Sequence, residues 1–165
     1  TLQVYSSIMG SGMSSRLFQE IREKRGLVYS IFSGNMFFED TGIFGIIAGT
    51  GKNKIKELIP ILCDELINSP MNLTEEEILK AKAKLKFSIV KSLESTSSNS
   101  AVWADHLLCY DRMIKVEEKI EKINKVSKES IERIVRKMLQ SKPTIASIGP
   151  IKNLEKLENI QSRFV

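Results

Sequence analysis

Two residues whose side chains can do chemistry, Arg22 and Tyr29, lie seven positions apart on either side of Gly26. A tyrosine with an unperturbed pKa near ~10 is a neutral O–H donor at pH 7, suited to an oxygen that gains negative charge. Arginine is permanently charged and binds a carbonyl or carboxylate through a planar fork. A simpler interpretation stays open, in which Arg22 pairs with Glu20 or Glu23 and Tyr29 covers a sheet face.

A helix and the extended segment after it must position these two side chains. The i, i+4 spacing of Leu17 and Ile21 predicts a helix over residues 14–25. Gly26 stands where a left-handed C-terminal cap is needed, and an extended segment is expected from residue 27. Under this arrangement the two polar side chains converge on one small volume.

The glycines before the helix, Gly10-Ser11-Gly12, admit two interpretations. Amides at the start of a helix can hold a phosphate group. However, the pattern reaches Ser15 instead of a third glycine, and no Gly-Lys-Ser/Thr follows. Nucleotide binding is therefore the minor alternative, and a tight turn that lets the loop approach other backbone is the simpler role.

Length and composition predict a single globular domain over residues 1–165. The chain is 42% hydrophobic, and its net charge of +5 is spread over alternating Lys and Glu, so we expect no nucleic-acid partner. No apolar run reaches ~18 residues and no leader opens the chain, so we expect neither a membrane span nor a signal peptide. Cys63 and Cys109 sit in apolar helical patterns, which predicts buried thiols in a reducing compartment.

The fold class that the patterns predict is α/β (α+β), with helices packed on a mainly antiparallel sheet. Alternation over 27–38, turn residues at 39–42 and an apolar run over 43–48 predict a β-hairpin. Residues 1–8 suit either a helix or a strand. The other expected elements are helices over 53–68, from Thr74 to Ile89, from Ala101 to Leu108, over 116–123, over 127–139 and from Leu154 to Phe164, with a loop over 95–100 and a strand over 144–148.

Two features predict where individual helices begin or bend. Thr74 and Glu77 have the spacing of a capping box at the start of one helix. Pro60 lies inside another predicted helix, where it removes a backbone hydrogen bond, so we expect a kink or a late start there.

The run MGSGMSSRLFQEIREKRGLVYS (9–30) resembles the glycine-rich loop and following helix in the C-terminal half of pitrilysin-type metallopeptidases, the group of insulysin and mitochondrial processing peptidase. The chain is most similar to the bacterial, processing-peptidase-like branch. The likeness continues in collinear order through FEDTGIFGIIAGTG (38–51), LTEEEILKAKAKLK (73–86), SLES (92–95), VSKESIERI (126–134) and IASIGP (145–150). It therefore covers nearly the whole chain and favours a helix at residues 1–8.

The resemblance implies a clamshell enzyme whose N-terminal half carries zinc on a His-x-x-Glu-His motif. The C-terminal half supplies an Arg and a Tyr to the substrate carbonyl, which assigns catalytic roles to Arg22 and Tyr29. The loop of Gly10, Ser11 and Gly12 lies near the chamber and is assigned to substrate binding. The implied partners are the zinc-bearing half and a peptide substrate.

This chain cannot build that zinc site itself. A catalytic zinc needs three protein ligands, whereas His106 is the one histidine and no His-x-x-Glu-His occurs. Three residues on, Cys109 gives a ligand-like pair, but ordinary helix packing is the stronger interpretation. We therefore expect no metal or other cofactor in this chain, with zinc in the partner half.

Two functions compete at this point. The first is the substrate-binding half of a zinc endopeptidase that cleaves peptides or presequences, and the second is a catalytically inactive, structural or assembly subunit. The family half carries further strands upstream, so we expect a fragment whose exposed sheet edges favour self-association. The expected location is the bacterial cytoplasm, with the periplasm or the mitochondrial matrix as alternatives.

Overall fold

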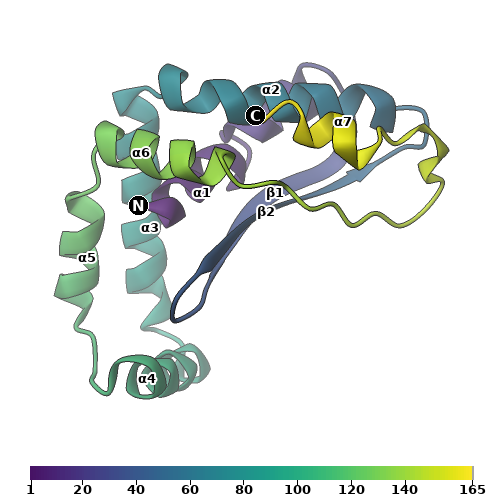
Figure 1. The fold of residues 1–165 in the computed structure, drawn as a ribbon. Coiled ribbons are helices and arrows are strands. Elements are labelled where there is room, and N and C mark those ends of the chain that lie inside the picture. Colours follow the sequence, from purple (N-terminus) through teal and green to yellow (C-terminus); the bar gives the residue numbers. More distant parts are fainter. Residues whose placement is uncertain (165) are drawn as a thin grey trace.

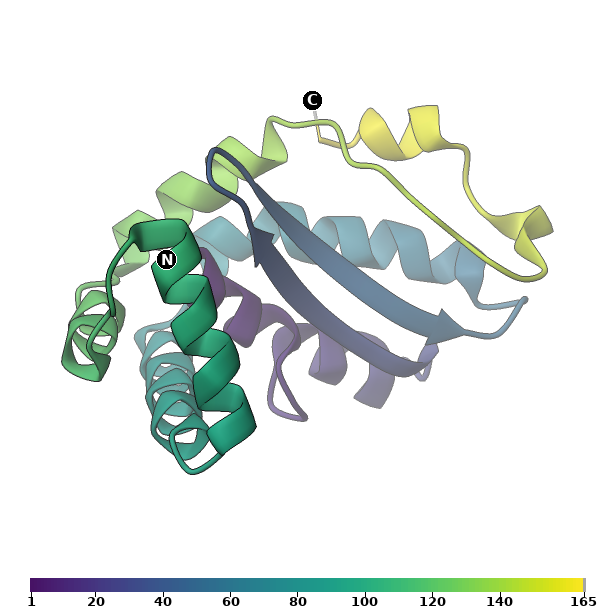
Figure 2. The same cartoon turned by 90° about the horizontal axis from the view of Figure 1, so that it is seen from below.

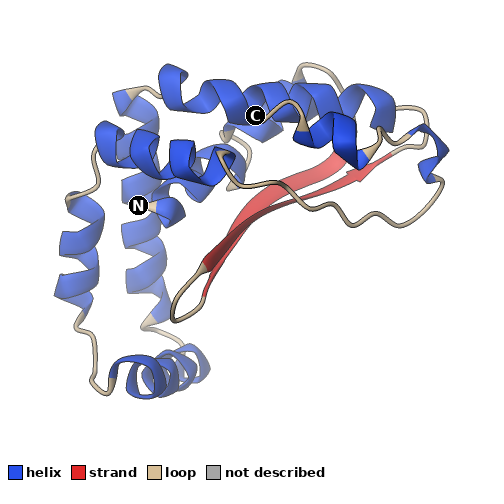
Figure 3. Ribbon diagram, viewed as in Figure 1, coloured by secondary structure: helices blue, strands red, loops and turns tan. Residues whose placement is uncertain are grey.

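A β-hairpin crosses the molecule diagonally in the computed structural model, which describes residues 1–164 (Figure 1). Strands β1 (Val28–Phe37) and β2 (Gly42–Thr50) pair antiparallel, with Phe32 opposite Ile47. Helices lie along one side of this two-stranded sheet, and its other side is open (Figure 3). The predicted hairpin and the predicted fold class, helices on an antiparallel sheet, are thus confirmed.

Helix α1 (Leu2–Gly10) forms the centre of the core. Its residues Tyr5 and Met9 are fully buried, and the Tyr5 hydroxyl shares a 2.8 Å hydrogen bond with Ser69. Burial raises the pKa of Tyr5 to about 12, so its proton stays in place. The helical alternative for the first residues is therefore the right one, because a strand would leave half of this apolar stretch exposed.

Helices α2 (Ile55–Asn72) and α3 (Glu75–Ser92) follow the hairpin. The predicted capping box is present, since Thr74 Oγ1 accepts from the Glu77 amide while the Glu77 carboxylate accepts from the Thr74 amide. Helix α2 starts two residues later than predicted and continues through Pro60 and Pro70.

The predicted loop over residues 95–100 is wrong. Ser95 is instead the N-cap of helix α4 (Thr96–Tyr110), accepting a hydrogen bond from the Ser98 amide. Serine is a strong N-cap, and this polar run holds no proline or glycine to prevent a helix from starting. The predicted helices that follow are confirmed as α5 (Val116–Asn124) and α6 (Lys128–Leu139). Helix α5 lies beside α3, and α4 crosses below them (Figure 1).

The predicted strand over 144–148 is also wrong in the described chain. This segment is extended and passes beside the hairpin (Figure 2), but none of the amides from Thr144 to Ile148 has a hydrogen-bond partner within residues 1–164. An extended backbone becomes a strand only when a neighbouring edge pairs with it. The expected terminal helix is reduced to a 3₁₀ turn, η2 (Ile151–Asn153), and a short α7 (Leu157–Gln161). Within residues 1–164 no helix has the length and hydropathy needed to cross a bilayer.

Candidate functional site

The helix that carries Arg22 is wound as a π-helix, η1 (Phe18–Glu23). The Lys24 amide donates to the carbonyl of Gln19, five residues back, at 3.0 Å. Gly26 closes the helix with φ +57° while its amide donates to the Arg22 carbonyl, which confirms the predicted left-handed glycine cap. π-Helices are rare, occur mostly as single turns within α-helices, and are frequent at functional sites.

The guanidinium of Arg22 is supported by an aromatic ring and lacks an acidic partner. Its Cζ lies 4.7 Å from the centroid of the Phe18 ring, one turn earlier. Glu20 pairs with Lys24 and Arg25 instead, and hydrogen bonding from Lys24 is the main reason why the pKa of Glu20 is lowered. The alternative of a surface pair with an adjacent acid is therefore wrong for the described residues, and the Arg22 fork faces solvent.

Tyr29 stands at a β-bulge. Val28 pairs with Thr50 and Ser30 with Gly49, so Tyr29 is the extra residue in β1. A bulge changes the direction in which a side chain points, and the Tyr29 side chain is 77% exposed. A Cβ atom built on Gly51 would lie 3.7 Å from the Tyr29 hydroxyl, so the ring lies over a glycine of the opposite strand end.

The backbone beneath Tyr29 is anchored on both sides. Leu27 and Val28 are buried, and Thr50 Oγ1 donates to the Leu27 carbonyl at 2.6 Å. The Leu27 amide also donates to the carbonyl of Ile21 in the π-helix. One compact turn thus fixes the start of β1 relative to the helix that carries Arg22.

The glycine-rich loop has clear packing roles. Gly10 is buried so closely against β1 that a Cβ atom would lie 2.2 Å from the Ser33 amide nitrogen, and Gly12 has φ +92°. This matches the tight-turn interpretation of the loop. Ser33 is four residues beyond Tyr29, about 13 Å along the strand at about 3.3 Å per residue. Contact of Gly10, Ser11 and Gly12 with a substrate stays a prediction.

Sequence reasoning missed two polar contacts that hold this loop on α3. Arg16 donates to both Glu77 carboxylate oxygens, with Nη2 2.7 Å from Oε2, and also to the Asn72 carbonyl. Lys84 donates to the Ser11 carbonyl. No local spacing rule predicts partners more than 50 residues apart. The Phe18–Arg22 contact, by contrast, has the i, i+4 spacing that could have revealed it.

An apolar sheet face continues from Tyr29 along the hairpin. The cross-strand pairs Phe32–Ile47 and Met36–Ile43 are about half exposed or more. Gly34 lies opposite Gly45 between the two pairs. The face beyond Tyr29 is therefore apolar and nearly free of side chains at its middle.

The described residues offer no place for a zinc ion. No group of three His, Cys, Asp or Glu side chains in residues 1–164 is arranged to hold a metal. His106 is buried, and its Nδ1 accepts from the Ile114 amide at 3.2 Å, so it serves helix packing. Cys63 is buried as predicted, and burial raises its pKa to about 11, but Cys109 is exposed, so the prediction of a second buried thiol is wrong.

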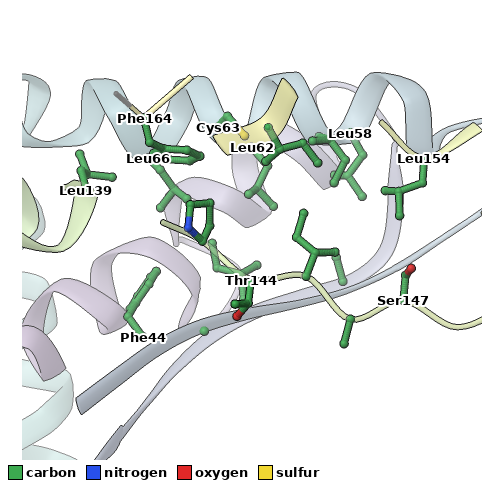
Figure 4. Close-up of a pocket in the computed structure, with 18 of the residues that line it drawn as sticks. Phe44, Leu58, Leu62, Cys63, Leu66, Leu139, Thr144, Ser147, Leu154 and Phe164 are labelled. Carbon is green, nitrogen blue, oxygen red and sulfur yellow. The ribbon is translucent and has the colours of Figure 1, made fainter. Parts of the chain in front are cut away.

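A cavity of about 420 Å³ opens elsewhere, between α2, β2 and the extended C-terminal segment (Figure 4). Its wall is largely apolar, with Leu58, Leu62 and Leu66 from α2 and Phe164 from the chain end. Neither Arg22 nor Tyr29 lines it. The cavity is therefore separate from the Arg–Tyr site.

The fold and the site together define a helix-covered hairpin domain that presents an arginine and a tyrosine, and in which residues 1–164 offer no set of metal ligands. Comparison with known proteins gives the family. Residues 1–85 match the model of the peptidase M16 inactive domain, so the chain belongs to the M16 peptidase family. The resemblance to pitrilysin-type metallopeptidases is confirmed at this level.

Individual relatives and solved structures are also similar to this chain. The chain is 36% identical to an uncharacterized zinc protease of Streptomyces coelicolor, over 91% of this chain and 33% of the relative. A protease from Helicobacter pylori superposes with a TM-score of 0.67 at 26% identity, over 82% of this chain and 33% of that one. A chain of complex III from Candida albicans reaches 0.88 at 21% identity, over 98% of this chain and 41% of that one, which shows a shared fold. The chain thus spans about a third of the length of the curated relative.

Proposed function

We propose that residues 1–165 are the substrate-binding half of a zinc-dependent endopeptidase and that Arg22 and Tyr29 act on the peptide bond to be cleaved. The observation that carries this proposal is the bulge at Tyr29, which leaves the phenol exposed, while the Arg22 guanidinium contacts the Phe18 ring and no acidic side chain of residues 1–164. The naming of the Streptomyces coelicolor relative as a zinc protease supports the class of reaction.

In this proposal the two side chains bind and orient the substrate carbonyl. The Tyr29 hydroxyl donates a hydrogen bond to the carbonyl oxygen, whose negative charge grows during hydrolysis. Arg22 binds a carbonyl or carboxylate of the same peptide through its planar fork. Both act from anchored backbone, so little entropy is lost when the substrate binds. Zinc belongs to the N-terminal half or a separate subunit, because the described residues cannot hold it.

The glycine-rich loop has a secondary role in the proposal. Gly10 is buried and acts through packing, whereas Ser11 is half-buried and Gly12 is exposed. The loop packs on the Ser33 side of β1, so these two residues contact a peptide that extends from Tyr29 along the exposed sheet face only where the peptide passes the edge of β1. The expected substrate is therefore an extended peptide, and not a compact small molecule.

The test uses the full-length protein and a peptide substrate. Tyr29→Phe should lower kcat about 100- to 1,000-fold, the loss typical of one oxyanion donor, with no change in the thermal midpoint. Arg22→Ala should raise KM and lower kcat together. Matched controls are Tyr110→Phe and Arg25→Ala, which alter an exposed tyrosine and a nearby exposed arginine. Wild-type kinetics in both site variants would remove the proposed roles.

The second candidate function is a catalytically inactive assembly subunit. The fold likeness to a chain of Candida albicans complex III is the observation behind it. A shared fold is compatible with either function. Full-length protein that binds peptide but shows no zinc-dependent cleavage, even before mutation, would favour this candidate.

A further inference from the structure

Large and small residues alternate on the side of the hairpin that faces away from α1. Ser33 marks the covered side, because its Oγ donates a hydrogen bond to the Ser6 carbonyl of α1. Successive side chains of a strand point to opposite sides, so the residues next to Ser33 in β1 lie on the exposed side. The cross-strand pairs on that side are, in order, Ser30–Gly49, Phe32–Ile47, Gly34–Gly45 and Met36–Ile43.

The two small pairs leave gaps between the large ones. A Cβ atom added to Gly34 or to Gly45 would meet no atom within 4 Å, so the space above this pair is empty. The large pairs on either side of it are about half exposed or more. The other gap, at Ser30, directly follows Tyr29 in the chain. Four residues separate Ser30 from Gly34, which is about 13 Å along β1 at about 3.3 Å per residue.

The chemistry of this face restricts what can lie on it. None of the four cross-strand pairs contains a charged residue, so a charged group placed there would lose hydration without compensation. The backbone hydrogen bonds of β1 and β2 lie in the plane of the sheet, so the face offers side-chain packing alone. An extended peptide matches its spacing, because same-side residues of such a peptide also repeat about every 6.6 Å. The face is continuous with Tyr29, where the proposed function places a peptide.

We propose that the exposed face of the hairpin selects extended peptides with two bulky apolar residues four positions apart and a small residue midway between them. This inference rests on the proposed function, which places the peptide at Tyr29. One bulky side chain fills the gap between Gly34 and Gly45, and the other lies over Ser30, near the bond to be cleaved. The midway residue passes over Phe32 and is therefore small. Gly34 and Gly45 thus determine specificity through the space they leave open.

Two peptides of equal composition test this inference on the full-length protein. Each is a fluorescent peptide of about twelve residues, made of serine and threonine with two phenylalanines, which stand either four or three positions apart. Fluorescence anisotropy gives the Kd, with a zinc chelator present to prevent cleavage. A spacing of three places the two rings on opposite sides of an extended peptide. The four-position peptide should therefore bind at least about 10-fold more tightly, the effect of burying one more phenylalanine side chain.

Equal Kd values for the two peptides would overturn the inference. Failure of both peptides to bind would also overturn it, because the face would then be covered by another part of the full-length protein.

A substitution that fills the gap gives an independent check. Gly45→Leu places a side chain in the empty space, so the Kd of the four-position peptide should rise to that of the three-position peptide, with no loss in the thermal midpoint. Ala83→Leu is the matched control, because it adds the same side chain at an exposed position of α3. It should keep the preference for the four-position peptide. An unchanged preference in Gly45→Leu would contradict a binding site at this gap.

Binding and cleavage separate this inference from the proposed function. Protein that prefers the four-position peptide but cleaves no peptide without the chelator would contradict the proposed function alone. Cleavage that depends on Tyr29 but shows no preference between the two spacings would contradict this inference alone.

Discussion

The two flanks of the hairpin differ. Side-chain contacts with α3 hold the first, which we call the closed flank, whereas the second, the open flank, has backbone groups without a partner in residues 1–164. On the closed flank, the loop over residues 10–16 is bound to α3 twice, through Arg16 with Glu77 and through Lys84 with the Ser11 carbonyl. On the open flank, residues 144–148 make no backbone hydrogen bond in the described chain, and residues 144–147 border a cavity of about 420 Å³.

This difference shows which part of the domain is held in place by contacts within residues 1–164. The closed flank is followed in the chain by the π-helix and the bulge. The backbone at Arg22 and Tyr29 is therefore held by contacts within residues 1–164. Side chains must be preorganised if they are to stabilise a transition state. The open flank has an apolar wall, like that of a core, but borders a cavity. Substitutions should therefore have larger effects on the closed flank in residues 1–165.

The largest expected effect comes from Gly10→Ala. The added Cβ atom would lie 2.2 Å from the Ser33 nitrogen, and the backbone of β1 cannot move away without breaking the pairing with β2. Overpacking of this kind should lower the free energy of unfolding by about 3 kcal/mol. Urea unfolding measures this loss. Gly45→Ala is the matched control, because nothing lies within 4 Å of its Cβ position. Similar losses for the two variants would show that the close contact at Gly10 is not decisive.

Arg16→Met should have the next largest effect. It leaves the partly buried Glu77 carboxylate without its bidentate donor. Because hydrogen bonds to charged groups contribute about 2 kcal/mol to stability, the free energy of unfolding should fall by that amount. Lys80→Met removes a salt bridge with Glu76 that is exposed on both sides, so it should change the free energy of unfolding by less than about 0.5 kcal/mol. Urea unfolding of both variants makes the comparison, and an equal cost would mean that the loop is not held by Arg16.

Local rules predicted much of the closed flank from the sequence. The glycine cap at Gly26 and the capping box at Thr74 each depend on residues within a few positions, and both are present. The π-helix was missed because its sequence has an ordinary helical spacing, and the extra residue per turn appears only in the hydrogen bonds. The bulge at Tyr29 was missed because it depends on the register with β2.

The open flank shows why the rest could not be predicted. The β-branched and apolar residues after Pro143 have the composition of a strand, but pairing depends on a partner that no local pattern specifies. The contacts of Arg16 and Lys84 are equally remote in sequence. Arg22 and Tyr29 could be singled out because they lie close together in the chain, on either side of Gly26. The convergence of their side chains and their roles stay predictions.

On the open flank, Leu62→Ala should lower the free energy of unfolding of residues 1–165 by only about 1 kcal/mol. Leu62 already borders a cavity, so few contacts are lost when its side chain is shortened. If another segment of the full-length protein fills the cavity, the same substitution should lower the free energy of unfolding there by about 2 kcal/mol more, because a filled core penalises a new void. Ile78→Ala in the buried core serves as the reference, with equal costs in both proteins. Equal costs for Leu62→Ala in both would argue against a filled cavity.

The smallest effect is the pH dependence of the closed flank. Burial alone would raise the pKa of Glu77, but the hydrogen bonds from Arg16 and Thr74 outweigh it and leave the pKa below the ordinary value of 4.5. The resulting stability is fully present above pH 4.5 and is lost as the pH falls through the lowered pKa of the folded state. Glu77→Gln should therefore flatten the acid limb of the unfolding free energy, by less than about 1 kcal/mol. Glu75→Gln, in the same helical turn, should leave that limb unchanged, and a wild-type acid limb in Glu77→Gln would show that this carboxylate does not link the loop to α3.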